Sequence, residues 1–402
     1  MTEDFFDKLL NFGSEWKVER IDFNENNEVD IYLKWNLEEY KKTHIETYEF
    51  VHDYRDYRRW RHLDILEFKT FINAKIPRVK SKDGSIESIK TPWASEGNRH
   101  TFLFEILVID WLLVSKNQTK TAQMLRCGFN LVNRIIHAAS QRGIERRDKN
   151  TVYEQLSLDE KAFQKGHNYV TVLSDPSTGT VIDIVKDRTK KACKALLDNA
   201  LSESQKSKVE TISLDMWKAF NTTVDEVLPK AKKVHDRFHL IKYLNEAIDK
   251  VRRREVKKNE ALVNSRYSLL KNTGNLTKNQ YFKFEEVLRL NTAVSYVWRL
   301  KESFKSLFGC KDYQEALNRF SDWNSFVLWE AIPELSKVAT MFSNHIQGVC
   351  NALVETASNA MAERLNGKIQ IIKTIGRGYR KFDNFRSAIL FFNGGLNLYP
   401  HS

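Results

Sequence analysis

Short apolar runs separated by polar turns dominate the chain from about residue 152 to residue 236. Five runs have the length and β-branched content of strands, at 156–159, 167–173, 180–185, 209–215 and 231–236. The Asp-Pro-Ser-Thr-Gly turn after the second run predicts an antiparallel hairpin with the third. Helical spacing follows the third and fourth runs. The order strand, strand, strand, helix, strand, helix, strand predicts one mixed sheet.

Apolar residues three and four positions apart characterise the long segment after these strands. The spacing is clear at Ile241, Leu244, Ile248 and Val251, and it predicts helices over roughly 240–345. This is far more chain than a compact sheet needs between two of its elements. We therefore expect a helical insertion, after which the chain returns to the sheet on one further helix.

A helix, a glycine turn and a second helix are predicted between the N-terminal region and the strands. The first helix covers 121–125, Gly128 lies in the turn, and the second helix covers 130–139. This is the helix-turn-helix pattern, in which the second helix, here with Arg134, enters the major groove of DNA. An ordinary helical hairpin has the same pattern, so this segment alone leaves both interpretations open.

The N-terminal region, up to about Trp93, mixes alternating apolar and polar runs with Asn and Lys clusters, which predicts a small β-rich module. Within it, the segment 54–62 interleaves tyrosine and tryptophan with arginine. Such a segment can stack on bases and bind phosphates. It is also typical of a strand with an aromatic core face and a solvated arginine face.

These patterns predict an α+β protein of several domains. The strand order is that of the ribonuclease-H-like fold, which places one catalytic acid on the first strand and a second at the end of the fourth. The predicted domains are a β-rich module at 1–95, a helix-turn-helix region with its linker at 96–150, a catalytic core at 151–239 and 346–402, and the helical insertion at 240–345.

Three acids are placed where such a sheet would bring them together. Asp159 and Asp215 each end a predicted strand, and Glu363 lies on the returning helix. Converging carboxylates bind hard divalent cations and support two-metal phosphoryl transfer, with ions about 3.5–4 Å apart. Each acid has a common structural alternative, because the aspartates can cap a turn or a helix and the glutamate can be an exposed helical residue. The strand order favours the metal site.

Several polar residues are candidates for an accessory role. Amides would flank the glutamate on one face of its helix, which holds Asn359, Glu363, Asn366 and Gln370. Asp236 ends another predicted strand and is a rival for a place in the acid cluster. His239 follows closely and could assist, although a histidine at a strand end is more often structural.

The balance of charge points to a polyanionic partner. The 402 residues have a formal net charge of +12, which favours nucleic acid over an acidic small substrate. Basic candidates for phosphate contacts occur in the insertion and after the glutamate; they are Arg252, Arg253, Arg254, Lys368, Lys373 and Arg377. Charge runs are also common on solvated faces that bind nothing.

The chain shows no sign of secretion or membrane insertion. Its four cysteines have no short pairing, its first residues lack a signal sequence, and the apolar run 101–114 contains Glu105 and Asp110 and is shorter than the roughly 20 residues that span a bilayer. We expect this run to be a buried helix and the protein to be cytoplasmic.

Four ordered motifs carry a resemblance to a known family. The segments 158–169, 213–217, 234–239 and 358–369 resemble the DDE transposases of the ISL-three insertion-sequence family, over about residues 45–395. The family often has a cysteine zinc ribbon near its N-terminus. The corresponding part of this chain has no thiols, so a ribbon-like module without zinc is expected.

The resemblance implies a function. Asp159, Asp215 and Glu363 would be the D, D and E, holding two magnesium ions that manganese can replace. The protein would bind the terminal inverted repeats of its element in double-stranded DNA, cleave and transfer strands, act as a homodimer or larger assembly, and associate with the nucleoid. The alternatives are a non-catalytic DNA-binding regulator or domesticated transposase, and a structure-specific nuclease on the same fold.

Overall fold

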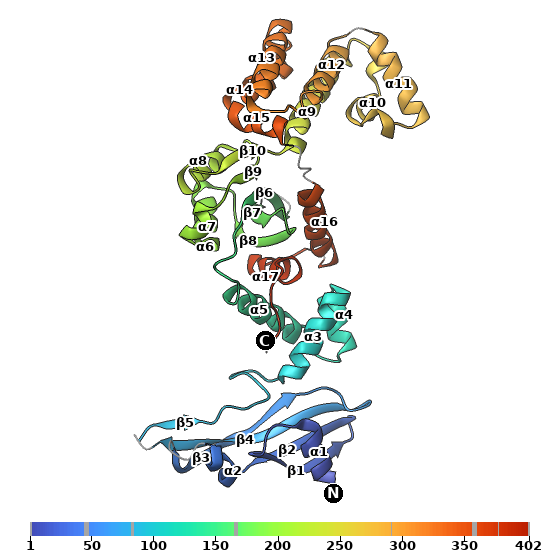
Figure 1. Cartoon of the computed structure of the whole chain (residues 1–402). Coiled ribbons are helices and arrows are strands. Elements are labelled where there is room, and N and C mark those ends of the chain that lie inside the picture. The colour runs from blue at the N-terminus through green and yellow to red at the C-terminus, as the bar shows by residue number, and fades with distance from the viewer. Residues whose placement is uncertain are drawn as a thin grey trace. The chain divides into compact units, whose positions relative to one another are not determined.

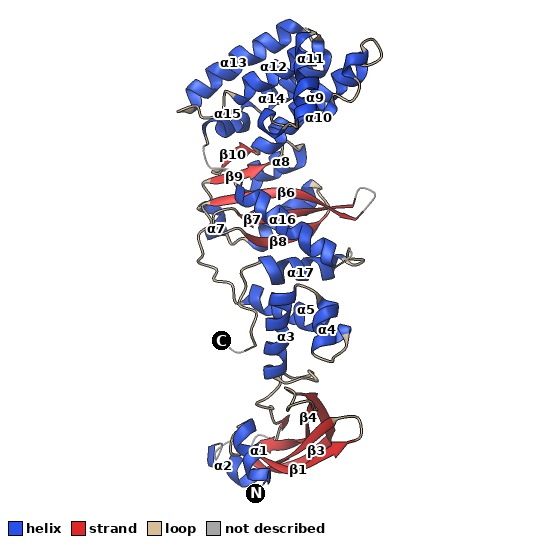
Figure 2. Cartoon of the chain, turned by 90° about the vertical axis from the view of Figure 1, so that its right-hand side faces the viewer, coloured by secondary structure: helices blue, strands red, loops and turns tan. Residues whose placement is uncertain are grey.

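The structure, a computed structural model, describes residues 2–43, 48–81, 84–164, 168–290, 292–355, 360–376 and 378–400. It is a mixed α/β chain with two five-stranded mixed sheets and many helices (Figures 1 and 2). The chain divides into two compact units, one formed by Met1–Arg147 with Leu396–Ser402 and the other by Asp148–Gly395. The domain boundaries expected from the sequence stay predictions.

The first unit begins with the predicted β-rich module. Its strand order is β1-β2-β4-β3, with β2 and β4 parallel and β5 paired to β4. Buried Val29, Ile31 and Leu33 alternate with more exposed residues along β2, as expected for a sheet with one core face. The elements are α1 (Thr2–Leu10), β1 (Trp16–Asn24), β2 (Glu28–Trp35), α2 (Leu37–Thr43), β3 (Tyr48–Arg61), β4 (Lys69–Ser81) and β5 (Ile86–Ser88).

The aromatic and basic segment 54–62 agrees only in part with the expected strand that has an aromatic core face and a solvated arginine face. Trp60 is buried in the core of the sheet, and Arg59 forms ion pairs instead of facing solvent alone. Tyr54 and Tyr57 remain about half exposed on β3.

Three helices complete the first unit: α3 (Phe102–Ser115), α4 (Gln118–Met124) and α5 (Phe129–Glu145). The expected buried helix at 101–114 is buried on one face only. Phe104 and Val108 are inside, whereas Leu103 and Val114 are exposed. Composition alone could not show this, because neighbouring elements pack against one side of α3. In the described parts of the chain, no helix has the length and apolar character to cross a bilayer.

The second sheet contains the five strands expected from the sequence, in the order β10-β9-β6-β7-β8. The first three in sequence pair antiparallel, and β9 and β10 run parallel to β6 and to each other. The elements are β6 (Gln155–Gln164), β7 (Asn168–Asp175), β8 (Thr180–Lys186), α6 (Lys190–Ala200), α7 (Glu203–Ser207), β9 (Thr211–Leu214), α8 (Lys218–Val227) and β10 (Lys232–His235).

One strand is longer than expected. The expectation that the first strand ends at Asp159 is wrong, because β6 continues to Gln164 and Asp159 lies in its middle. The added residues pair with β7, for example Lys161 with Val170. Their polar sequence hides the strand, since it is the pairing and not an apolar pattern that keeps this part extended.

A long helical segment follows β10. The predicted spacing is confirmed on its first helix, where Leu244, Ile248 and Val251 are fully buried in a large apolar core. The elements are α9 (Arg237–Glu255), η1 (Glu260–Leu262), α10 (Arg266–Leu270), η2 (Thr273–Asn275), α11 (Lys278–Arg289), α12 (Ala293–Lys305), α13 (Tyr313–Glu330), α14 (Pro333–Asn344) and α15 (Ile346–Val354).

The chain returns to the sheet on α16 (Ala360–Ile375) and α17 (Phe382–Asn393). Figure 1 shows α16 on one side of the sheet and α6 with α8 on the other. The buried residues of α16 are Leu365, Ile369 and Ile372. The amide face expected to dock therefore meets the sheet only in part: Asn366 is half-buried, whereas Gln370, another member of that face, is exposed.

Candidate active site

The strand register brings three aspartates to one level of the second sheet. Leu158 of β6 pairs with Leu214 of β9, and Leu214 pairs with His235 of β10. Because these strands are parallel and in register, the next residues also lie side by side, on strands about 4.8 Å apart. Those residues are Asp159, Asp215 and Asp236. Asp215 therefore lies between the other two.

Alternation decides which side of the sheet the first two carboxylates occupy. Leu158 and Leu214 belong to the apolar cluster that includes residues of α6 and α8. Successive side chains of a strand point to opposite faces, so the following aspartates lie toward the face covered by α16. The contact of Asp159 Oδ2 with Asn366 Nδ2 of α16, at 3.1 Å, agrees with this direction.

The carboxylate of Asp215 is held by neutral groups. Its Oδ1 accepts hydrogen bonds from the backbone N–H of Met216 at 2.6 Å and from the Tyr243 hydroxyl of α9 at 3.2 Å. His239 Nδ1, a buried atom that has no hydrogen-bond partner among the described residues, lies 3.8 Å from Oδ2. No lysine or arginine of the described chain forms an ion pair with Asp215. Its negative charge is therefore available to an added cation.

Asp159 already has a cation beside it. Lys161, two residues later on the same face of β6, places its ammonium 2.8 Å from Oδ2, the oxygen that also accepts from Asn366. Among the described residues, no hydrogen bond reaches Oδ1. The side chain of Asp159 is only 19% exposed, so the lysine lies where a metal ion would meet the same carboxylate.

The helix α16 runs alongside β6. Asn366 contacts Asp159, and Lys373 Nζ donates to the carbonyl of Ala162 at 2.5 Å. Seven helical residues rise about 10.5 Å and three strand residues about 10 Å, so the two elements advance together. The backbone of Glu363 lies one turn before Asn366, about 4.5 Å along the helix. The side chain of Glu363, and Asn359 as a whole, lie outside the described residues.

Asp236 has a structural role that neither other aspartate has. It is the N-cap of α9, and its Oδ1 accepts from the backbone N–H of Phe238 at 2.8 Å. By contrast, Asp215 precedes α8 without capping it, because Trp217 occupies the N-cap position. Asp236 thus lies at the same level of the sheet as the other two acids, but one of its carboxylate oxygens is bonded to the N-terminus of α9.

A transposase family model, that of the ISL-three DDE type, matches residues 156–389, which is more than half of the chain. This chain belongs to the ISL-three family of DDE transposases. It is 26% identical over 353 residues to the transposase for insertion sequence element IS1557 of Mycobacterium tuberculosis. The aligned region covers 80% of this chain and 78% of the relative. It is 25% identical over 337 residues to the transposase for IS1001 of Bordetella parapertussis, with 82% of each chain covered.

The predicted basic contacts of this transposase differ in how much charge they leave available. Arg252 and Arg253 both pair with Asp249, and Arg254 pairs with Glu334. Arg134 is exposed on α5, and Lys368 is exposed on α16. Arg377 lies outside the described residues. The arginine run of α9 is therefore largely neutralised within the helical segment.

A buried histidine anchors the helical segment of the transposase beneath the site. The ring of His235, at the end of β10, packs against Gly348 of α15, where an added Cβ would lie 2.6 Å from Nε2. Burial lowers the pKa of His235 to about 4, so the ring is neutral at pH 7 and its Nδ1–H can donate to the carbonyl of Leu214 at 3.1 Å. Burial, followed by the charge of Asp215, raises the pKa of Tyr243 above its usual range.

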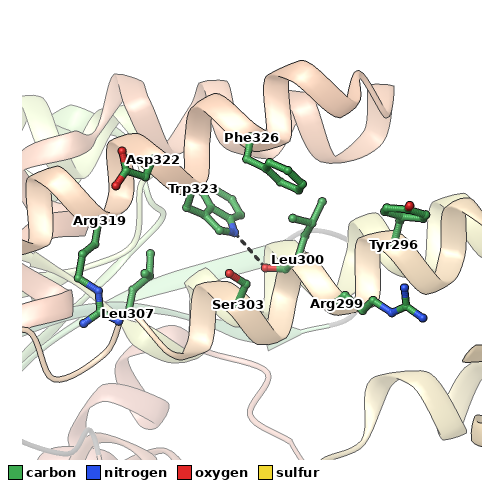
Figure 3. Close-up of a pocket in the computed structure, with 9 residues that line it drawn as sticks. All are labelled: Tyr296, Arg299, Leu300, Ser303, Leu307, Arg319, Asp322, Trp323 and Phe326. Atoms are coloured by element: carbon green, nitrogen blue, oxygen red, sulfur yellow. Dashed lines mark hydrogen bonds between the residues drawn. The ribbon is translucent and has the colours of Figure 1, made fainter.

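A cavity of about 550 Å³ lies elsewhere in the transposase, between α12 and α13. Figure 3 shows Trp323 and Phe326 of α13 facing Leu300 of α12, whose carbonyl accepts the Trp323 indole N–H at 2.9 Å. The lining contains one acid, Asp322, and no residue of β6, β9 or α16. The cavity is therefore separate from the acid-bearing site.

Sequence reasoning missed Lys161 and Tyr243. A signal existed for both, because a residue two positions after Asp159 shares its face of a strand, and Tyr243 follows Asp236 by two helical turns. Neither signal was usable without knowing that β6 extends past Asp159 and that α9 begins at Arg237.

Proposed function

We propose that this transposase binds the terminal inverted repeats of its insertion sequence and catalyses metal-dependent cleavage and transfer of DNA strands. The observation that carries the proposal is the adjacency of Asp159 and Asp215 on parallel strands, with Asn366 of the Glu363 helix in contact with Asp159. The sheet order β10-β9-β6-β7-β8, in which β7 runs against the direction of the other four strands, supports a ribonuclease-H-like core.

For this site we propose two magnesium ions, with manganese as a substitute. Asp159 and Asp215 would supply oxygen ligands, which hard cations prefer. The ammonium of Lys161 beside Asp159 supplies part of the positive charge that such cations would bring. Glu363 would be the third ligand. When bound, magnesium would polarise the scissile phosphate and lower the pKa of the attacking water.

The residues of the chain position these ligands. Asn366 orients the carboxylate of Asp159, and Tyr243 together with the Met216 N–H orients that of Asp215. His239 lies near enough to Asp215 to take part in the same network. Since the chain itself forms no covalent bond to the DNA in such a transfer, its contribution is orientation and charge.

DNA recognition is assigned to α4 and α5 as a helix-turn-helix. Supporting this, the outward face of α5 carries side chains able to read base edges; they are Asn130, Asn133, Arg134, His137 and Gln141. Arginine suits guanine and the amides suit adenine. Binding of two ends at once would need at least a homodimer, which sedimentation of the complex with end DNA would reveal.

The decisive test is cleavage of a duplex that carries the element's own ends, found as inverted repeats in the DNA flanking the gene. We expect nicking and strand transfer only with magnesium or manganese, and none with Asp215→Asn, while binding in a gel-shift assay is retained. Asp225→Asn, a change on α8, is the matched control. Specific binding without cleavage by the wild type would overturn the enzyme and favour a regulator; cleavage of branched DNA regardless of end sequence would favour a nuclease.

A further inference from the structure

An exposed tryptophan stands two residues after Asp215. Trp217 is 44% exposed and precedes the first turn of α8. The Asn221 side chain donates to the carbonyl of Asp215 at 3.3 Å and to that of Trp217 at 3.1 Å. One amide thus ties the backbone of the acid to the backbone of the tryptophan. The backbone at Trp217 is therefore held close to that of Asp215, at the end of β9.

The guanidinium group of Arg188 packs against this indole. Its guanidinium carbon lies 4.6 Å from the ring centroid of Trp217 and 4.3 Å from that of Tyr169. It also pairs with Glu160 at 2.8 Å, and Glu160 directly follows Asp159. We call Tyr169, Arg188 and Trp217 the Arg188 stack. Because successive side chains of a strand alternate, Glu160 points to the face of the sheet opposite the Asp159 carboxylate, so the stack lies on the α8 side of the sheet, next to the end of β9.

The backbone before Arg188 is strained and firmly held. Asp187 has φ of 82°, a left-handed conformation that a residue with a side chain rarely adopts. Its N–H donates to the Tyr169 carbonyl at 2.9 Å, and its carbonyl accepts from the Thr171 hydroxyl at 2.7 Å. Strain of this kind persists where neighbouring contacts impose it. Here these contacts fix the backbone position from which the Arg188 side chain extends.

The exposed part of Trp217 is apolar ring surface. Its indole N–H already donates to the carbonyl of Arg188 at 3.3 Å, so the ring is not exposed in order to bond water. Bases stack on such rings with about 1–3 kcal/mol each. Within an intact duplex both faces of a base are covered, whereas an unpaired or extruded base offers a free face to such a ring.

We propose that Trp217 is the stacking platform for one unpaired base of the DNA end, next to the scissile phosphate. This rests on the proposed function. The Cα atoms of Asp215 and Trp217 are at most about 7 Å apart, so the base belongs to one of the few nucleotides nearest the phosphate at Asp215. Lys218, exposed in the uncapped first turn of α8, faces the backbone of that nucleotide.

The first test measures single-turnover cleavage by the full-length protein on end DNA with magnesium. Trp217→Ala is expected to slow cleavage between about fivefold and a hundredfold without weakening duplex binding, whereas Trp217→Phe retains most of the rate. Trp329→Ala is the matched control, because Trp329 is 77% exposed on α13 in the helical segment. An unchanged rate for Trp217→Ala overturns the proposal.

Abasic substrates separate stacking from a structural role. Removing one base near the cleavage point abolishes the cost of extruding it, so the defect of Trp217→Ala shrinks on that substrate alone. An equal defect on every abasic substrate also overturns the proposal, since it would show damage to the fold near Asp215.

A binding test keeps this inference distinct from the catalytic proposal. With Asp215→Asn protein, which we expect to bind without cutting, end DNA with one unpaired base at the cleavage point should bind more tightly than intact duplex. The gain disappears in the double variant with Trp217→Ala. Loss of metal-dependent cleavage by the wild type would refute the proposed function, whereas equal affinities in this assay would refute the stacking platform.

Discussion

Asp30 and Asp159 are alike in position and opposite in what surrounds them. Each lies within a strand, each has a largely buried side chain, and each accepts a hydrogen bond from an asparagine amide, Asn73 at 2.7 Å and Asn366 at 3.1 Å. Asp30 also receives two bonds from Arg59, at 2.7 and 2.9 Å. Asp159 has instead one contact with a lysine.

The cation decides what each carboxylate can do. The guanidinium of Arg59 lies 3.4 Å from the ring centroid of Phe71 and also binds Glu28, so it cannot leave without breaking several contacts. Lys161 is a point charge on a flexible stem, which can move aside. An acid bonded to a fixed arginine stabilises a sheet, whereas one beside a lysine and an amide remains able to take a metal ion.

The largest predicted difference separates these two aspartates. Asp159→Asn should reduce metal-dependent cleavage on the order of a thousandfold, because a metal ligand supplies several kcal/mol of transition-state stabilisation. Asp30→Asn should leave cleavage at saturating DNA unchanged and lower the midpoint of urea unfolding. Rates measured beside unfolding curves check both. Equal loss of cleavage in the two variants would show that Asp159 has no catalytic role that Asp30 lacks.

Both sheets should lose stability at acid pH, because each has a buried histidine with a lowered pKa. Burial lowers the pKa of His62 and of His235 to about 4, against about 6.5 in unfolded chains. Between these values the unfolded chain binds a proton that the folded chain does not, so this stabilisation is complete above about pH 6.5 and is lost as pH falls toward 4.

Hydrogen exchange at β4 and at β10, measured at pH 7 and pH 5, tests this. His235→Asn retains a donor for the Leu214 carbonyl and should remove the pH dependence at β10 only. An undiminished pH dependence there would show that another group is responsible.

The hydroxyl of Tyr243 tests the claim that neutral donors orient the acids. Tyr243→Phe removes one bond to the charged Asp215, worth about 1.5 kcal/mol or more, so cleavage should fall about tenfold. The loss should appear in the rate at saturating DNA, with end binding unchanged. Tyr281→Phe, on α11, is the control. A loss in affinity instead of rate would argue against a positioning role.

The smallest effect is expected from the cation beside Asp159. Lys161→Met removes a partly exposed ion pair worth up to about 1 kcal/mol, so the magnesium concentration needed for half-maximal cleavage should fall by up to about fivefold. Arg59→Met, the matched change in the other sheet, should instead cost about 1.5–3 kcal/mol of stability. A higher magnesium requirement in Lys161→Met would show that the lysine helps to build the site.

The strands of the acid-bearing sheet were predictable because apolar runs and turn residues mark them. The second half of β6 was not, since Lys161 and Gln164 lie in a polar stretch whose extended form depends on β7. The amide face of the returning helix was right at Asn366 and wrong at Gln370, because the buried side of α16 is set by packing on the sheet.

The sequence by itself determined which residues are acidic, where most of the strands and helices lie, and that Asp159, Asp215 and Glu363 occur in an order typical of the family. These are local properties, since periodicity and turn chemistry act over a few residues. Tertiary structure alone decided that Asp236 caps α9, that Tyr243 holds Asp215, that Lys161 stands beside Asp159 and that Arg188 supports Trp217. The contacts of Tyr243 with Asp215 and of Arg188 with Trp217 join segments far apart in the chain. Those of Lys161 and Asp236 are local, but they depend on where β6 ends and α9 begins, which strand pairing and helix packing set.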